Sequence, residues 1–577
     1  MKIFFKRLMF SLFSLILFIS LGIFVFTLVV DPNQFKPDIQ STATNAGVEL
    51  DMDGDLAWQL FPFGLSAEKV NFVFSDQSMA GSADQLRFGI GISTLISFAS
   101  QRSQLPISQL SVTNGRVLYA LANSLPLQFS QIDLSVNDVN STGKAFPIRL
   151  SLLAPKGLKI SLNTELGVRL SEQTVTDISI ANLQLKINRL SINGYLNTSN
   201  NMTKIQGQIN SEDFDLIQQF KLAKRFIPDL LMPKMADAKA LTNVSFDSFF
   251  DIEVDGLSKI QTTLVVDGQA IDIDVDIDQP QYKLRTVVSG QTLNLDAYQS
   301  LANSQSDNSM LFAPLAIPMT VWHGQSQFEL NFLGIELGDL RLSNLYANLF
   351  GNQNIFRLTS LNGDIYNGHI NATGSLNLQD ATPAFSFSSF FRNIDLNTAT
   401  QSMDNINIAG RLNFETTITG SGDTAESILQ SLDGDGKITI DKPNYQGVNL
   451  EQTLCNAAAV FGGKPIPKTT WSENTEFDDI NAKLQFKNGR LFINNYQTQL
   501  ANIDIYGNGD INLSSLRYSF NTTVLATQPT SSPQGCNINP MIVKREIPFS
   551  CKGELGDSIK CKPDNNLIQT LLLTPKL

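Results

Sequence analysis

Most of the chain beyond residue 30 alternates between hydrophobic and polar residues with a period of two. The clearest example is Ile271–Asp278, in which four aliphatic residues alternate with four aspartates. Asn502–Leu513 repeats the pattern with isoleucines at 503, 505 and 511 and polar residues between them. Because successive side chains of a strand point to opposite faces, these runs predict β-sheet with one apolar and one polar face.

Helical periodicity is scarce by comparison. Beyond the N-terminus we expect short helices at Asp31–Ala46, Phe214–Phe226, Ser427–Gln430 and Leu450–Phe461. Asn-Gly pairs, which suit two-residue hairpin turns, predict turns at 114–115, 193–194, 362–363 and 488–489. The sequence therefore predicts many strands and few helices.

The strand pattern also repeats over longer distances. Residues 342–378 (LSNLYANL, then LNGDIYNGHINATGSLNL) resemble residues 477–513, and Ile107–Ala120 resembles the start of the same unit. Three segments that begin at Phe214, Leu293 and Ile394 each indicate a short helical turn at the end of a unit. Repeated strands that stack on their neighbours predict an extended body.

An amphipathic sheet has to cover its apolar face, and too few helices are predicted to do so. The sheet could instead curl on itself, as a barrel, a sandwich or a trough lined by apolar side chains. The 38 phenylalanines of the chain would make such a lining strongly hydrophobic. A stacked pair of closed sandwiches remains open as an alternative.

The N-terminus carries a different pattern. Lys2, Lys6 and Arg7 precede an uncharged apolar run from Leu8 to Val30. As a helix the run would be about 34 Å long, enough to cross a hydrocarbon core of about 30 Å. No small-residue cleavage site follows it, so we expect an uncleaved single-pass anchor. The basic residues place the N-terminus in the cytoplasm and everything from Asp31 onward across the membrane.

The charge and composition of the chain limit the classes of partner that it could bind. The net charge is −12, and charged residues make up 17% of the chain. The excess of acidic residues argues against nucleic acid, because there is no surplus of cations to neutralise phosphates. It also argues against electrostatic docking of the body on anionic lipid.

All four cysteines, Cys455, Cys536, Cys551 and Cys561, lie in the last quarter of the chain. An even number in a translocated region predicts two disulfides. The short spacing of Cys551 and Cys561 suits one bridge and leaves Cys455 with Cys536, although the sequence does not choose among the three pairings. A zinc site is disfavoured by the spacing, since no C-x₂₋₄-C pair is present.

Motifs for catalysis are missing from the sequence. The two histidines, His323 and His369, are not in a Ser/His/Asp or Cys/His context, and we interpret His369 as a surface or cross-strand residue. Asp433–Ile440 (DGDGKITI) resembles part of a calcium loop, but Lys442 stands where a bidentate Glu belongs. We interpret this motif as a hairpin turn. No catalytic residue, metal ligand or cofactor is predicted, and we expect a non-enzymatic protein.

Two stretches carry a family resemblance. The first runs from Asp31 through the segment VELDMDGDLAWQLFP at 48–62. The second covers the C-terminal third, with LDGDG at 432–436, GNGDINL at 507–513 and IPFSCKG at 547–553. Together they resemble the AsmA family of Gram-negative inner-membrane proteins. The order of the segments agrees over nearly the whole chain, with a looser match at 120–400.

The resemblance implies a periplasmic body built as a long curled β-sheet with an apolar groove, similar to bridge-like lipid-transfer proteins. It implies phospholipid and the inner membrane as partners, and it supplies no catalytic residues. The expected function is therefore to bind and conduct phospholipid between the inner and outer membranes. The alternative is a non-enzymatic assembly factor or scaffold that acts on outer-membrane proteins or lipopolysaccharide levels, with outer-membrane assembly components as partners.

The expected fold is mainly β, with a single transmembrane helix followed by an elongated, curled, repetitive sheet and a few short helices. The expected regions are 1–7 (cytoplasmic), 8–30 (anchor), 31–120 (N-terminal β region with an entry helix), 121–400 (repetitive sheet) and 401–577 (C-terminal β region with the cysteines). Residues of the groove cannot be assigned from the sequence, because a register slip of one residue reverses every face.

Overall fold

The computed structural model describes 19 segments of the chain. They are residues 24–45, 47–60, 63–76, 78–90, 107–120, 126–139, 143–171, 174–226, 235, 237–298, 324–380, 382–401, 408–447, 449–452, 455–456, 470–532, 536–538, 543–555 and 561–563. Contacts divide the chain into two units. Unit 1 comprises Met1–Met232 and Leu241–Asp267, and unit 2 comprises Pro233–Ala240 and Gly268–Leu577.

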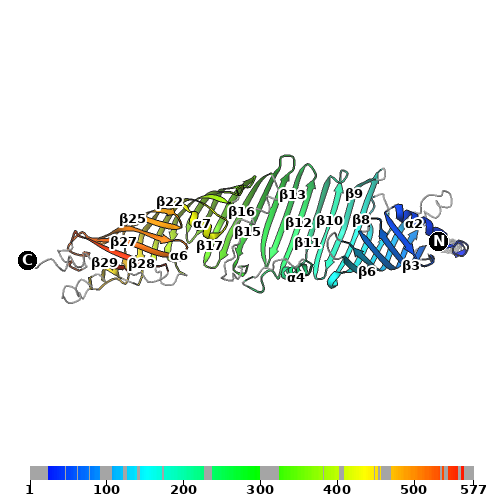
Figure 1. Ribbon diagram of the computed structural model, residues 1–577, viewed down its shortest axis with the longest axis horizontal. Helices are drawn as coiled ribbons and strands as arrows, with labels where there is room; N and C mark the ends of the chain where they lie inside the picture. The colour runs from blue at the N-terminus through cyan, green and yellow to red at the C-terminus, as the bar shows by residue number, and fades with distance from the viewer. Residues whose placement is uncertain are drawn as a thin grey trace, which may run out of the picture. The chain divides into compact units, whose positions relative to one another are not determined.

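Unit 1 is built from short N-terminal helices and a run of antiparallel strands (Figure 1). Its elements are η1 (Pro32–Phe35), α2 (Lys36–Asn45), β1 (Val48–Met52), β2 (Ala57–Leu60), β3 (Phe63–Phe74), β4 (Met79–Ile90), β5 (Ile107–Tyr119), β6 (Leu127–Asn137), β7 (Phe146–Ala154), η2 (Pro155–Gly157), β8 (Leu158–Ser171), β9 (Thr174–Ile187), β10 (Leu190–Ser199), β11 (Lys204–Ser211), α4 (Leu216–Phe226), β12 (Val244–Glu253) and β13 (Leu257–Val266). From β3 to β13 each strand pairs antiparallel with the next strand in the chain.

Unit 2 has the same architecture, except that one pair of neighbouring strands runs parallel. Its elements are β14 (Gln269–Asp278), β15 (Lys283–Asn294), η3 (Asp296–Tyr298), β16 (Gln325–Leu337), β17 (Leu340–Asn352), β18 (Ile355–Ile365), β19 (Gly368–Asn377), β20 (Ala384–Asp395), α6 (Leu396–Ala399), β21 (Ile408–Ser421), α7 (Ala425–Ser431), β22 (Asp433–Tyr445), β23 (Thr475–Glu476), β24 (Ile480–Lys487), β25 (Arg490–Leu500), β26 (Ile503–Asn512), β27 (Arg517–Ala526), β28 (Glu546–Glu554) and β29 (Cys561–Pro563). Neighbouring strands pair antiparallel except β15 and β16, which run parallel. The prediction of a mainly β fold with few short helices is confirmed.

The best-packed hydrophobic core of unit 1 lies at its N-terminal end. There η1 and α2 pack on the first strands, and Met52, Leu65 and Val70 are almost fully buried. Trp58 adds an aromatic cluster: its ring stacks on Phe63 at 5.3 Å between centroids and meets Phe26 edge-on at the same distance. The short helical stretch at residues 24–29 is thereby packed against the first strands of the sheet.

The short helices fall largely where the sequence predicts them. The predicted helix at Asp31–Ala46 is η1 followed by α2, the one at Phe214–Phe226 is α4, and the one at Ser427–Gln430 lies within α7. Residues 450–452 and 455–456 are helical, and the rest of the predicted helix there lies outside the described residues. The three predicted unit ends coincide with α4, η3 and α6.

Three of the four predicted Asn-Gly turns are wrong. The pairs at 114–115, 193–194 and 362–363 lie inside β5, β10 and β18, whereas Asn488-Gly489 does join β24 to β25. Asn114 has a φ of 49° at a point where the register of β5 with β6 shifts. Gly194 is close to the neighbouring strand, since a Cβ there would lie 2.1 Å from the carbonyl oxygen of Gln208. Bulges and close approaches use the same residues as tight turns.

The calcium-like motif is also not a hairpin turn. Asp433 begins β22 directly after α7, and Asp433–Ile440 pairs along its length with β24. A Cβ on Gly434 would lie 2.2 Å from the carbonyl oxygen of Thr417, so the glycine is explained by the close approach of β21. The motif is therefore part of the sheet.

Candidate functional site

The two faces of the sheet in β7–β13 differ in chemistry. In β8, the even-numbered positions from Leu158 to Leu170 are aliphatic except for Thr164, and the odd-numbered positions are polar or glycine. Strand pairing places like beside like, as in Leu166 opposite Ile180 and Asn163 opposite Gln184. We call the side of this sheet that carries Leu166 and Ile180 the apolar face, and the opposite side the polar face.

Cross-strand pairs extend the apolar face over seven strands. One row contains Phe146, Leu166, Ile180, Leu196, Gly207, Phe250 and Ile260, each paired with the next. A second row contains Leu150, Leu162, Leu185 and Ile192. Because neighbouring strands lie about 4.8 Å apart, six steps between seven strands span about 29 Å.

Glycine shapes the middle of the first row. A Cβ on Gly207 would lie 2.6 Å from Cζ of Phe250. The phenylalanine ring therefore lies over the glycine of the neighbouring strand, where any larger residue would displace it. This contact holds the ring flat against the sheet. The side chains on that part of the apolar face therefore project only a short way from the backbone.

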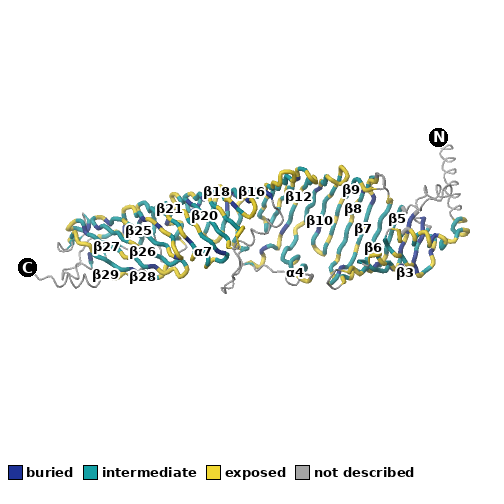
Figure 2. The backbone as a smooth tube through the Cα atoms, turned by 45° about the horizontal axis from the view of Figure 1, so that its top comes forward, coloured by how far each residue is buried: buried dark blue, intermediate teal, exposed yellow. Residues whose placement is uncertain are grey.

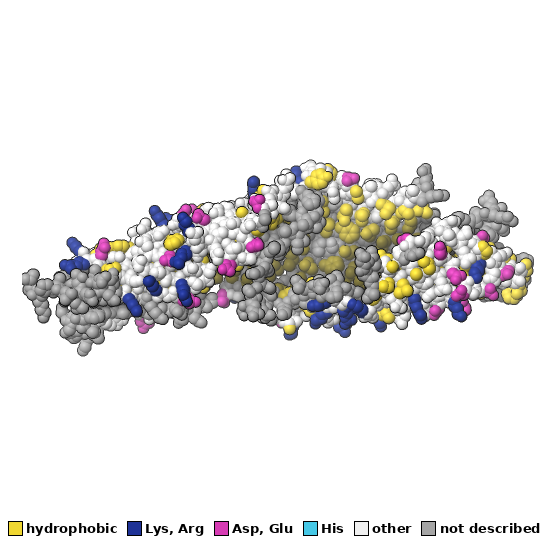
Figure 3. All heavy atoms as spheres, in the orientation of Figure 1, with side chains coloured by type: hydrophobic (Ala, Val, Ile, Leu, Met, Phe, Trp, Pro, Cys, Tyr) yellow, Lys and Arg dark blue, Asp and Glu magenta, His cyan; other side chains and the backbone are white. Residues whose placement is uncertain are grey.

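The apolar face is not buried like a core. In the first row Phe146 is buried, but Leu166, Ile180, Leu196, Phe250 and Ile260 remain half-buried. Figure 2 draws β8, β9, β10 and β12 mostly as half-buried or exposed. The same part of the molecule is hollowed in Figure 3, and hydrophobic side chains line the hollow over β8–β13. These strands thus form an open apolar groove.

The polar side chains of the polar face form hydrogen bonds and a salt bridge with one another. The amide of Gln206 donates to Asp251 at 2.8 Å, and the amide of Gln208 donates to Asp247 at 2.7 Å. Lys204 forms a salt bridge of 3.3 Å with Asp251. This face has the exposed hydrogen-bonded ladders of a water-facing surface, so the groove lies on the other side.

Unit 2 contains a polar pocket of about 900 Å³ beside the hairpin between β18 and β19. Asp339, Arg341 and Asp364 contribute to its lining. The side-chain amide of Asn344 donates to Asp364 at 2.7 Å and, together with the weaker effect of His369, lowers the pKa of that carboxyl. The pocket is polar, unlike the groove of unit 1.

His369 agrees with its interpretation as a surface or cross-strand residue. It lies in β19 opposite Asp364, is exposed, and its Nδ1 is 3.1 Å from the Asp364 carboxylate. His323 lies outside the described residues. Among the described residues, no group of three or more His, Cys, Asp or Glu side chains is arranged to hold a metal ion.

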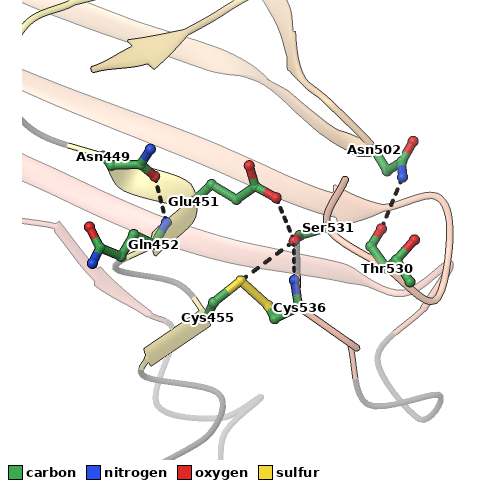
Figure 4. The surroundings of a disulfide bond; sticks show 8 residues. All are labelled: Asn449, Glu451, Gln452, Cys455, Asn502, Thr530, Ser531 and Cys536. Carbon is green, nitrogen blue, oxygen red and sulfur yellow. Dashed lines mark hydrogen bonds between the residues drawn. A yellow bond between two sulfur atoms is a disulfide. The ribbon is translucent and has the colours of Figure 1, made fainter. Parts of the chain in front are cut away.

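Both predicted disulfides are present: Cys455 bonds to Cys536, and Cys551 bonds to Cys561. Cys551 and Cys561 face each other across β28 and β29. Figure 4 shows Ser531 beside the other bridge, where its hydroxyl donates to Glu451 and accepts from the backbone N–H of Cys536. This bridge joins the segment between β22 and β24 to the segment after β27.

The predicted anchor, Leu8–Val30, lies mostly outside the described residues. Its last residue, Val30, accepts a 2.8 Å hydrogen bond from the indole N–H of Trp58. In the described part of the chain, no helix is both long and apolar enough to cross a membrane.

The sequence contained the signal for the groove but did not identify it. The alternation of Leu158–Leu170 is as regular as that of Ile271–Asp278. The strand pairing was needed to show that its apolar residues continue into the next strand, and their burial to show that they stay uncovered. The polar pocket of unit 2 was not anticipated, because its residues come from separate hairpins.

Comparison with known proteins identifies a family and a relative. Residues 1–78 and 160–496 match the AsmA family. Protein AsmA of Escherichia coli (strain K12) is 19% identical over 546 residues, which cover 88% of this chain and 86% of that protein. No solved structure matches the chain significantly. Because the family match covers most of the sequence, the chain belongs to the AsmA family.

Proposed function

We propose that this protein binds phospholipid by its acyl chains on the apolar face of β7–β13 and conducts it between the inner and outer membranes. Family membership and the β-rich fold are consistent with a role in building the cell envelope. The observation that carries the more specific proposal is the open groove: five side chains of one row are apolar and only half-buried. An exposed apolar surface of this kind marks a binding site.

Lipid binding follows from the chemistry of the groove. Burial of each methylene group contributes about 0.8 kcal/mol, so a long acyl chain can bind without specific polar contacts. A row of aliphatic side chains that continues from strand to strand offers similar contacts along its length. We propose a non-enzymatic carrier of this kind, held in the inner membrane by Leu8–Val30 with its body in the periplasm.

Adjacent phenylalanines in β12 offer a matched test. Phe250 lies on the apolar face, and Phe249, which is 38% exposed, points to the polar face. Each is replaced in turn by photoreactive benzoylphenylalanine in the full chain, and intact cells are irradiated. Mass spectrometry of the purified protein then identifies the adducts. We expect phospholipid adducts at position 250 and few or none at position 249.

A second pair gives an independent check in β10, where Leu196 lies on the apolar face and Tyr195 on the polar face. Equal lipid labelling on both faces would contradict the groove. Labelling of outer-membrane proteins at 196 and 250, without lipid, would favour the alternative assembly function and reject the conduit.

A further inference from the structure

The helix α4 concentrates positive charge in an acidic protein. Its sequence, LIQQFKLAKRF, holds Lys221, Lys224 and Arg225 and no acidic residue, whereas the whole chain has a net charge of −12. All three cations are exposed. Among the described residues, none of them forms a salt bridge with a carboxylate. Their charge is therefore available to an external anion.

The helix is fixed at the edge of the groove. Phe214, just before it, forms an isolated bridge with Val244 at the start of β12. The N–H of Leu216 donates to the carbonyl of Leu241 at 2.9 Å, and Asp215 accepts from the N–H of Gln218 at 2.8 Å. The Phe214–Val244 bridge and the Leu216–Leu241 bond place α4 beside the end of the sheet at which β12 begins.

The helix is also amphipathic, with its cations on the outer side. Leu216, Phe220 and Ala223 recur at helical spacing and are half-buried, whereas Lys221 and Arg225 lie one turn apart and are exposed. Figure 3 shows Lys and Arg side chains gathered at the margin of the hollow, at the position of α4 in Figure 1. An apolar groove and a basic rim thus lie side by side within unit 1.

We infer that α4 binds the phosphate of a lipid headgroup while the acyl chains of the same lipid lie on the apolar face, so that the groove prefers lipids that carry a phosphate. This inference rests on the proposed function. A lipid that enters an apolar groove must keep its charged headgroup hydrated, and the rim is where the groove meets water. Lysine and arginine there form charge-assisted hydrogen bonds to phosphate oxygens.

The test removes the charge from the helix and, as a control, from the polar face. The test variant is Lys221→Gln, Lys224→Gln, Arg225→Gln, because glutamine keeps the helix propensity. The control variant is Arg149→Gln, Lys186→Gln, Lys259→Gln, which removes three exposed cations from β7, β9 and β13 on the polar face. Both variants change the net charge equally.

Binding is measured with the full chain in dodecylmaltoside micelles at low salt. The two probes carry the same chain-labelled fluorescent acyl group, one as phosphatidylglycerol and the other as diacylglycerol without a phosphate. The wild-type chain should prefer phosphatidylglycerol by about tenfold, as expected for several exposed charge contacts. The test variant should lose this preference and keep its affinity for diacylglycerol, and the control variant should keep both.

Salt gives a measurement that needs no variant: raising sodium chloride tenfold should reduce the preference of the wild-type chain, because exposed charges are screened. Equal affinity of the wild-type chain for both lipids would show that α4 does not bind the headgroup. It would still agree with lipid binding in the groove. Binding of neither lipid would overturn the proposed function as well. If the test variant keeps its preference in micelles but no longer sediments with phosphatidylglycerol vesicles, α4 docks on the membrane surface and the inference is wrong.

Discussion

The two disulfides should contribute unequally to stability. Cys455 and Cys536 are 81 residues apart, and Cys551 and Cys561 are 10 residues apart. A cross-link restricts the unfolded chain more when it closes a longer loop. The loop-entropy relation gives about 4.5 kcal/mol for the longer loop and about 2.7 kcal/mol for the shorter one. Removal of the first bridge should therefore destabilise the C-terminal region by about 2 kcal/mol more than removal of the second.

The contacts around the Cys455–Cys536 bridge should persist when the bridge is removed. Cys455 and Ser531 are each 1% exposed, and the contacts of Ser531 with Glu451 and with the backbone of Cys536 do not require the sulfur–sulfur bond. Alanine is the better replacement, because it adds no polar group to this buried site. The cost then comes mainly from the unfolded state.

The assay is pulse proteolysis of the full chain across a urea series, with the C-terminal fragments followed on gels. It compares the pair Cys455→Ala, Cys536→Ala with the pair Cys551→Ala, Cys561→Ala. Reduction of the wild-type chain should lower the urea midpoint at least as far as the first pair does. Equal midpoints for the two pairs, or a larger shift for the second, would refute the loop-entropy argument.

Two further predictions concern one site in each unit. Replacement of Trp58 by Ala removes its ring from the aromatic cluster and its hydrogen bond to Val30, and should cost about 2 kcal/mol, measured as earlier proteolysis near residue 30 in urea. The Trp58→Phe control keeps a ring and should lose about half as much. In unit 2, Asn344→Ala should raise the pKa of Asp364 toward its ordinary value in a carbon-13 NMR titration. Because this pKa is lowered in the folded protein, the stabilisation from Asp364 is present above its unfolded pKa and is lost as the pH falls through the folded value; an unchanged pKa in the variant would reject the hydrogen bond as its main cause.

The alternation of residues predicted individual strands well but not their partners. Ile271–Asp278 lies within β14 as expected, because its side-chain period is set by the strand itself. The parallel pairing of β15 with β16 could not be predicted, because the alternation within a strand does not indicate which strand it pairs with or in which direction. Three of the four Asn-Gly pairs failed as turn markers, because a left-handed asparagine serves equally well in a bulge, as at Asn114.

The groove shows the same division between local and non-local information. The alternation in Leu158–Leu170 shows which residues of this strand share the apolar face. Only the register of the paired strands shows that Leu166, Ile180 and Leu196 form one row. The amphipathic helix α4 was also predictable as a helix. Its place at the groove edge depends on the pairing of Phe214 with Val244, 30 residues later in the sequence, and could not be predicted.

The neighbour-to-neighbour pairing has a consequence for how the protein reaches its native state. Sheets usually form slowly, because their strands must find partners far away in the chain. From β3 to β11 each strand instead pairs with the one made just before it, so each hairpin can form soon after its second strand appears. The long connections at 212–243, 295–324 and 446–479 delay the strand that follows each of them. Assembly should proceed in steps from the N-terminus and slow at these three points.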